Sequence, residues 1–379
     1  MINKISKRNI IALYSRLLYV SRAWKTNKKI VVIESDDWGS IRTSNIDSFK
    51  FFQKQGYNMH NSPYTYDCLE SDDDLSALYD VLRSIKDSKG NNLTMTANMI
   101  MANPNFDAIE KNNFQEYVYE PVRNTLSKYK HSSNVVSLWK EGMKDGFFFP
   151  QFHGREHIRF WEWLENLQNK EKETMETFKN NMCGLPIKVS KKNIGYFKAQ
   201  YIDNKELQKY EVDLNEIISE GIELFKDEFD FYSLTTIAPN CGWTESAEDA
   251  WLKNKIKFIQ GGFLQEHHYK NNIKYIPHYL GEIKQSNKMM YLVRNCSFEP
   301  CYSSSEDYWI STFKQVVRAF KFHTPAIISS HRINYIGSIN QKNRNNGLSQ
   351  LTKLMEAIKK SYPDVLFLNT LELANMIDE

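Results

Sequence analysis

Two short motifs in this 379-residue chain carry residue types that could bind a metal ion and use it. The first is a pair of adjacent carboxylates, Asp36 and Asp37, which follows an apolar run. The second is a pair of histidines four residues apart, His153 and His157, which can sit on one face of a helical turn and converge on one ion. A further histidine, His331, ends another apolar run. Because apolar runs of this length predict buried strands, we expect a metal-dependent hydrolase with its site at the carboxyl ends of barrel strands.

These residue types can divide the work of hydrolysis between them. Zinc and related ions bind imidazole and carboxylate groups and keep one position open for water, so Asp37, His153 and His157 are the candidate ligands. The ion lowers the pKa of its bound water, which leaves Asp36 free to act as general base. His331 could then donate a proton to the leaving group. The expected cofactor is one divalent ion, zinc first, with cobalt, nickel, manganese and iron as alternatives.

Apolar runs alternate with amphipathic segments along the chain, which predicts an α/β fold with a mostly parallel sheet. We expect strands at residues 29–34, 93–101, 231–237, 256–260, 289–293, 326–330 and 365–368. The sequence contains no internal repeat, low-complexity segment or linker. We therefore expect an N-terminal helix within residues 1–28 and one barrel over residues 29–379. Within that barrel, residues 159–228 predict a helical insertion.

Composition argues against several other classes of protein. The net charge is only +3, from 49 Lys and Arg against 46 Asp and Glu, and no block of like charge indicates nucleic-acid binding. The five cysteines are odd in number and include no CxxC pair, which favours reduced thiols and a cytoplasmic protein over a disulfide framework. No run of about 18 apolar residues predicts a transmembrane segment. The oligomeric state is not predicted by these features.

The N-terminal helix has two interpretations. Leu13, Tyr14, Leu17 and Leu18 fit one apolar face, with Arg16 among them. Such a helix can pack that face against the domain, or it can lie in shallow contact with an anionic membrane surface. The sequence leaves both interpretations open.

The chain resembles the polysaccharide deacetylases, the NodB-homology group of carbohydrate esterases, in the order and approximate spacing of five motifs. The family's first motif, a strand followed by Thr-Phe-Asp-Asp-Gly, is matched by residues 34–39, and its second, His-Ser/Thr-x-x-His, by residues 153–157. Its fifth, an apolar strand that ends in a histidine, is matched by residues 327–331. The third, Arg-x-Pro-Tyr/Phe-Gly, and the fourth, an Asp and a Trp before a helix, are matched less closely by residues 237–242 and 307–309.

This resemblance implies a distorted (β/α) barrel, of about seven strands in that family, that removes acetyl groups from a carbohydrate, N-acetyl groups above all. By that likeness Asp37, His153 and His157 hold the divalent metal. Asp36 is then the base that activates the metal's water, and His331 is the acid that protonates the departing group. The implied partner is a carbohydrate substrate.

In the family, the third motif helps to bind the oxyanion and to orient the base. The resemblance places the oxyanion on the metal and on the backbone N–H of Asn240, just after Pro239. The family's third motif also supplies an arginine that orients the base, and this chain has an isoleucine there. Arg42, Arg294 or Arg332 could replace it from elsewhere in the chain.

Other positions around the motifs also depart from the family or remain open. Trp38 lengthens the turn after the two aspartates, and Gly154 replaces a hydroxyl residue between the histidines. Arg155, also between the histidines, is a candidate for a supporting hydrogen bond. Either Glu299 or Asp307 is expected to orient the acid histidine.

Three functions are compatible with the sequence. The first is a metal-dependent carbohydrate deacetylase. The second is an amidohydrolase that uses the same barrel on a small non-sugar amide. The third is a catalytically silent barrel that binds glycans or a protein partner. The full set of candidate ligands, base and acid argues against the third function, and the missing third-motif arginine keeps it open.

Overall fold

The computed structural model describes residues 7–269, 272–303, 305 and 307–379. Its strands are β1 (Ile30–Trp38), β2 (Met95–Ile100), β3 (Ala102–Pro104), β4 (Tyr119–Pro121), β5 (Phe148–Gly154), β6 (Thr235–Ile237), β7 (Phe258–Gly261), β8 (Leu264–Tyr269), β9 (Asn272–Pro277), β10 (Glu282–Ile283), β11 (Met290–Val293), β12 (Cys296–Ser297), β13 (Ala326–His331) and β14 (Leu366–Phe367). Its α-helices are α1 (Lys7–Arg22), α2 (Ile46–Lys54), α3 (Asp72–Ser84), α4 (Phe106–Lys111), α5 (Val122–Ser127), α6 (Val135–Lys144), α7 (Phe160–Gln168), α8 (Lys172–Phe178), α9 (Asn204–Leu207), α10 (Leu214–Phe229), α11 (Glu245–Lys253), α12 (Tyr308–Lys321), α13 (Gln341–Ser361) and α14 (Thr370–Asp378).

The main sheet is parallel along most of its length. Its strands run in the order β11–β7–β6–β5–β2–β1–β13–β12, and every neighbouring pair in that series is parallel. The short strand β10 is antiparallel to β11 at one edge, and β14 pairs with the start of β1. The expected α/β fold with a mostly parallel sheet is therefore confirmed.

The two ends of this series meet, so the sheet closes into a distorted barrel. Between β11 and β12 the chain passes from one edge strand to the other: the N–H of Arg294 donates to Gly261 O (2.8 Å) on β7, and the N–H of Asn295 donates to Ile327 O (3.1 Å) on β13. The side chain of Asn295 adds bonds to Ile327 N (2.9 Å) and Pro325 O (2.8 Å). Backbone and side-chain bonds together make a seam where the strand itself is interrupted.

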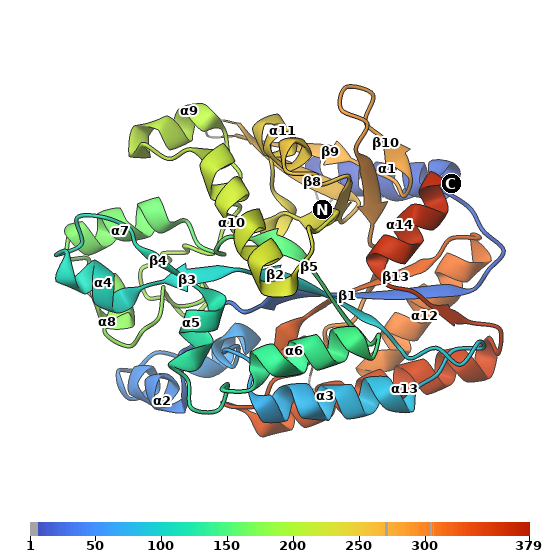
Figure 1. Ribbon diagram of the computed structural model, residues 1–379, viewed down its shortest axis with the longest axis horizontal. Helices are drawn as coiled ribbons and strands as arrows, with labels where there is room; N and C mark the ends of the chain where they lie inside the picture. The colour runs from blue at the N-terminus through green and yellow to red at the C-terminus, as the bar shows by residue number, and fades with distance from the viewer. Residues whose placement is uncertain (1–6, 270–271, 304, 306) are drawn as a thin grey trace, which may run out of the picture.

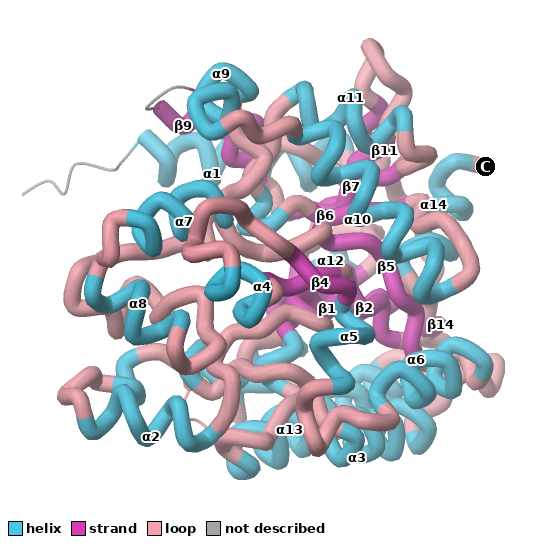
Figure 2. The backbone as a smooth tube through the Cα atoms, turned by 60° about the vertical axis from the view of Figure 1, so that its left-hand side comes forward, coloured by secondary structure: helices cyan, strands magenta, loops and turns pink. Residues whose placement is uncertain are grey.

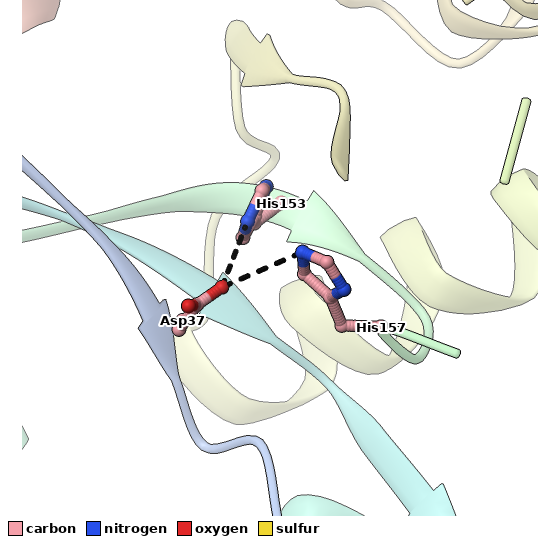
Figure 3. A group of neighbouring side chains, drawn as sticks. All are labelled: Asp37, His153 and His157. Atoms are coloured by element: carbon pink, nitrogen blue, oxygen red, sulfur yellow. Dashed lines mark ion pairs between the residues drawn. The ribbon is translucent and has the colours of Figure 1, made fainter. Parts of the chain in front are cut away.

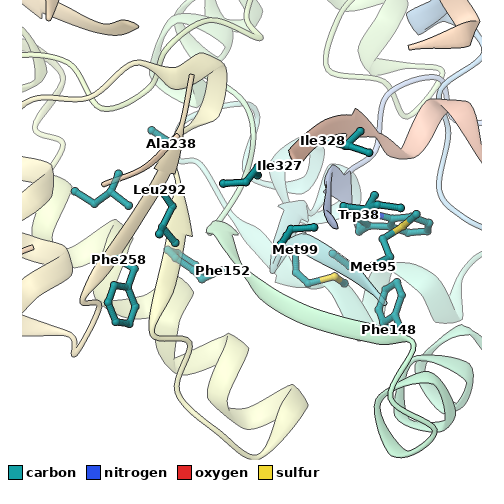
Figure 4. Close-up of a cluster of buried hydrophobic side chains, with 14 of the residues drawn as sticks. Trp38, Met95, Met99, Phe148, Phe152, Ala238, Phe258, Leu292, Ile327 and Ile328 are labelled. Carbon is teal, nitrogen blue, oxygen red and sulfur yellow. The ribbon is translucent and has the colours of Figure 1, made fainter. Parts of the chain in front are cut away.

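Helices surround the strands, as Figures 1 and 2 show. In Figure 1, α3, α6 and α13 lie on one side of the central strands, and α10 and α11 lie on the other. Buried apolar side chains fill the space between strands and helices, among them Trp38, Met99, Phe152, Phe258 and Ile327 (Figure 4). Nearly every residue of β1, β2 and β5 is buried, as expected of parallel strands that are covered on both faces.

The layer of helices around the barrel lacks a described α-helix at the connection from β7 to β11, and α1 lies at this position instead. The connection from β7 to β11 is the antiparallel hairpin β8–β9 and contains no α-helix in its described residues. Helix α1 packs against β9, and its Tyr19, together with Ala23 just after the helix, is buried in the main core. Tyr19 also accepts a hydrogen bond from Asn295 at the barrel seam (2.9 Å).

Residues 159–228, expected to be a helical insertion, contain helices at both ends and a long irregular segment between them. Helices α7 and α8 are separated by a turn in which Lys170 has a φ of 53°. Residues 179–203 then form neither helix nor strand. That segment lies over the carboxyl ends of the strands, because several of its side chains line the cavity described below.

Candidate metal centre

A β-bulge at the end of β1 brings both adjacent aspartates to the same site. Successive side chains of a regular strand point to opposite faces, so Asp36 and Asp37 would normally be separated. Here the register with β2 shifts between Ser35 and Trp38, and Asp37 has a φ of 77°. Trp38, the residue that lengthens the turn, is therefore accommodated by the bulge, and the bulge changes the direction of the neighbouring side chain.

The turn after the bulge requires glycine. Gly39 has a φ of 81°, and a Cβ atom there would stand 2.6 Å from the carbonyl oxygen of Ile100. Its N–H donates to both carboxylate oxygens of Glu70 (3.1 and 3.3 Å). The buried carboxylate of Glu70 thus holds this turn in place.

The two histidines do not share a helical turn, and that expectation is wrong. His153 lies on β5, and His157 lies in the irregular segment that follows the strand. Gly154 between them has a φ of 152°, and a Cβ there would come within 3.2 Å of Glu156 O. This backbone conformation, which L-residues rarely adopt, turns the chain so that the second histidine folds back beside the first. It also explains why no hydroxyl residue stands at this position.

Asp37, His153 and His157 form a buried group whose ligand atoms all lie within 4.8 Å of one another (Figure 3). Each histidine Nε2 is 3.5 Å from Asp37 Oδ1, which is longer than a normal N–H···O hydrogen bond of about 2.7–3.2 Å. Two ligand atoms about 2.0–2.1 Å from one zinc ion are about 3.3 Å apart at the tetrahedral angle. The spacing therefore suits atoms that share an ion.

The surroundings of the two histidines also suit a metal ion. His153 Nδ1 bonds the carbonyl oxygen of Ile237 (2.9 Å), which leaves Nε2 to face Asp37, as in many metal sites. Burial and the nearby charge of Arg42 lower the pKa of His157 to about 3, so its imidazole is neutral at ordinary pH. Neutral imidazole and ionised carboxylate are the forms that bind a divalent ion. Burial raises the pKa of Asp37, but Arg42, 3.5 Å from Oδ2, and the neighbouring histidines together outweigh burial and hold that pKa well below its usual range, so Asp37 is ionised.

Arg294 binds the other carboxylate, that of Asp36. Its Nη1 and Nη2 donate to the two carboxylate oxygens (2.6 and 2.7 Å), and its Nε donates to Glu34 (2.5 Å). Asn98 Nδ2 adds a bond to Asp36 Oδ1 (2.7 Å). Burial raises the pKa of Asp36, but the charge and hydrogen bonds of Arg294 outweigh it and lower the pKa to about 2. Of the three arginines considered from the sequence, Arg294 at the barrel seam is the one in contact with this carboxylate, while Arg42 contacts Asp37.

His331 completes the site from the end of β13. Its Nε2 lies 3.9 Å from Asp36 Oδ2, and its Nδ1 bonds Glu299 Oε1 (2.6 Å). The other oxygen of Glu299 accepts a bond from Asn334 (2.8 Å). Burial lowers the pKa of His331, but Glu299 outweighs it and raises the pKa to about 10, so the imidazolium persists through neutral pH. Asp307 lies exposed at the start of α12, away from His331.

A cavity of about 430 Å³ opens above these groups. Asp36, Asp37, His153, His157, His331, Arg294 and Asn240 line it. The irregular segment contributes a wall that the sequence did not reveal, made of Leu185, Pro186, Ile187, Lys188, Phe197 and Lys198. Tyr64 and Tyr302 line the opposite side, with the Tyr64 ring edge-on to His331 at 6.1 Å between centroids. No short motif marks these residues, since they come from loops without periodicity.

Two other candidates lie behind the site or outside it. Pro239 is buried at the start of the turn that presents Asn240. Arg155 points away from the ligands: it donates to Glu156 (2.6 Å) and also bonds Glu220, and it stacks over the ring of Tyr119. It lines a different cavity, beside α7 and α10.

No protein-family model matches the chain, and no curated protein matches it either. Among solved structures, it is similar to a 4-alpha-glucanotransferase from Thermococcus litoralis (6% identity, TM-score 0.45), over 92% of this chain and 40% of that one. It is also similar to a probable polysaccharide deacetylase from Pseudomonas aeruginosa PAO1 (9%, 0.45), over 92% and 91% of the two chains. A CE4 family pseudoenzyme from Bacillus anthracis (9%, 0.36) matches over 92% and 66%.

Proposed function

We propose that this protein is a metal-dependent hydrolase that removes acetyl groups, N-acetyl groups in particular, from a carbohydrate. The observation that carries the proposal is the separation of the two adjacent aspartates. Asp37 faces two histidines at distances that suit a shared ion, while Asp36 faces an arginine and a histidine. One carboxylate is thus available to hold a metal and the other to move a proton.

The residues present fit a divalent ion, held by Asp37, His153 and His157. When bound, such an ion polarises a carbonyl oxygen and makes water a stronger nucleophile at neutral pH. Zinc is the first choice, and cobalt, nickel, manganese and iron suit the same ligands.

Proton transfer falls to Asp36 and His331. Asp36 is ionised and accepts a proton from the attacking water, and Arg294 and Asn98 fix its orientation. His331 is protonated and lies 3.9 Å from the same carboxylate, so it can protonate the departing amine. The backbone N–H of Asn240, in the cavity wall, is the candidate donor to the oxyanion.

A carbohydrate substrate is favoured by the walls of the cavity. Its lining includes the aromatic residues Tyr64, Tyr302 and Phe197 and the basic residues Lys188 and Lys198, which can donate to hydroxyl oxygens. This mixture of aromatic surface and polar groups suits a sugar ring. An amidohydrolase acting on a small non-sugar amide remains the second candidate, because the same acid, base and ligands would serve it.

The metal site is tested first. Purified protein, stripped and reloaded with Zn²⁺, is expected to retain about one ion per chain by elemental analysis, and His157→Ala is expected to lose it. His131→Ala changes an exposed histidine outside the site and serves as the matched control. Retention of the ion by His157→Ala would contradict the ligand assignment.

The reaction is tested by acetate release. The loaded protein is assayed with N-acetylglucosamine, its oligomers, and nucleotide-linked and lipid-linked N-acetyl sugars, with a small non-sugar N-acetyl amide as the comparison. Acetate from at least one sugar, and none from the simple amide, is expected. Release only from the non-sugar amide would favour the second candidate, and no release from any substrate by the loaded protein would contradict the enzyme.

A further inference from the structure

Helix α1 is apolar on two opposite sides. Its inner side buries Ser15 and Tyr19 against the domain, and Ala23, just after the helix, is buried as well. Its outer side carries Ile10, Leu13, Tyr14 and Leu17, which are 58%, 62%, 56% and 63% exposed, respectively. Positions 10, 13, 14 and 17 follow the spacing of one helical stripe, so these four side chains form a continuous apolar strip that faces away from the domain.

This strip differs from the other exposed apolar residues. Elsewhere in the described chain, residues such as Phe51, Leu252 and Ile310 are exposed singly on different elements, which needs no explanation in a protein surface. Four large apolar side chains gathered within two helical turns form a patch of the kind that marks a binding surface. Packing α1 against the domain, the first interpretation of its sequence, accounts for the inner side alone.

All charged residues of α1 are basic. The helix contains Lys7, Arg8, Arg16 and Arg22 and no acidic residue. Arg16 and Arg318 both line a cavity of about 560 Å³ beneath the helix, and no acidic residue is among its described lining residues. Within the described part of the chain, neither of these two guanidinium groups takes part in an ion pair.

We propose that α1 lies in the plane of an anionic membrane surface, with Ile10, Leu13, Tyr14 and Leu17 inserted among the lipids. An apolar strip on a helix whose charged residues are all basic is the pattern of interfacial helices, and basic side chains near an anionic surface add electrostatic attraction. A second copy of this chain fits less well. One strip of four side chains offers a few hundred Å², whereas a stable dimer buries about 800 Å² per partner.

The inner side of α1, opposite the strip, lies close to the candidate active site. The cavity beneath α1 shares Cys241, Arg294 and Ser329 with the cavity above the metal ligands. No described helix is long and apolar enough to cross a membrane, so contact would be limited to the surface. The docking itself does not depend on the proposed activity.

The test is co-sedimentation of the full chain with vesicles. Binding is expected to vesicles of phosphatidylglycerol and phosphatidylcholine, to weaken as salt is raised, and to be much weaker with phosphatidylcholine alone. The double variant Leu13→Ser/Leu17→Ser is expected to lower the affinity about tenfold or more. Leu252→Ser, at another exposed leucine, is the matched control and should bind as the unaltered protein does.

Two further measurements keep the result interpretable. Both altered leucines are exposed, so thermal unfolding of the double variant should match that of the unaltered protein. Arg16→Gln/Arg22→Gln should weaken binding and reduce its salt dependence. Failure to bind anionic vesicles at low salt would overturn the proposal. So would light scattering that shows a dimer which Leu13→Ser/Leu17→Ser converts to a monomer, because a second copy would then occupy the strip.

Discussion

Two buried arginines lie on either side of the turn after β1. Each binds two carboxylates, but the two clusters have different surroundings. Arg294 binds Glu34 and Asp36 inside the barrel. Arg332 binds Asp67 and Glu70, at 2.9 Å each, just outside it. Each guanidinium thus holds two carboxylates away from water, an arrangement that is costly unless geometry and hydrogen bonds are good.

The two clusters differ in whether their side chains reach the cavity. Asp36 and Arg294 line the cavity, and Asp36 also faces His331. Arg332 instead uses its remaining donor on Ser40 O (2.8 Å), within the turn whose Gly39 N–H binds Glu70. The Arg332 cluster therefore fixes the backbone that follows the aspartates, while the Arg294 cluster orients a carboxylate that can still react. Substitutions in the two clusters should separate activity from stability.

The largest expected effect is on activity, in Asp36→Asn. The amide cannot accept the proton, so the rate of acetate release should fall by about 10²–10⁴-fold. The amide oxygen can keep one of the bonds from Arg294, but the amide NH2 cannot accept the other, so the free energy of unfolding should also fall, by about 1–3 kcal/mol. The bound metal should be retained, since Asp36 is not a candidate ligand. Steady-state kinetics, metal analysis and urea unfolding measure the three quantities.

Asp307→Asn makes the same chemical change at an exposed position and should leave all three quantities unaltered. Near-normal turnover by Asp36→Asn would show that another group is the base. Loss of the metal from that variant would instead mean that Asp36 belongs to the ligand set.

The second effect is on stability, in Arg332→Gln. Removing this side chain, which is completely buried, leaves Glu70 without its cation and Asp67 with only Arg42, at 3.8 Å. Breaking a buried ion pair in this way costs about 3–5 kcal/mol, measured as a lower urea midpoint at unchanged slope. Arg83→Gln, which removes a half-exposed arginine from surface ion pairs, should cost less than about 1 kcal/mol. Equal losses from the two variants would show that the Arg332 cluster has no special role in the turn.

The same comparison shows what the sequence could and could not predict. Strands β1 and β13 are apolar runs, and the aspartates and His331 stand at their ends, so local pattern is enough to predict both elements and the gathering of these side chains. Arg294 is 258 positions from Asp36, and it lies where the barrel strand is interrupted between β11 and β12. No periodicity marks such a seam, so the sequence left three arginines open.

The histidine pair shows a different limit. A separation of four residues is compatible with a helical turn, and the backbone instead leaves a strand through Gly154. Glycine permits both conformations, so spacing alone could not choose between them. The irregular segment 179–203 was beyond prediction for a related reason: its cavity-lining side chains are placed by tertiary packing, not by a repeating pattern.

The smallest expected effect is in Glu299→Gln, which tests the role of His331 beside the Arg294 cluster. Glu299 raises the pKa of His331 to about 10, so the imidazolium is present below that pH and is lost as pH rises through it. If His331 is the acid, kcat/KM should fall on the alkaline side near that value, and Glu299→Gln should move the fall to lower pH, toward the ordinary value of about 6.5. Near pH 6 the variant should lose only about tenfold or less, because its imidazole can still be protonated there. An alkaline limb at the same pH in both proteins would assign that limb to another group and leave Glu299 as a structural partner of Asn334.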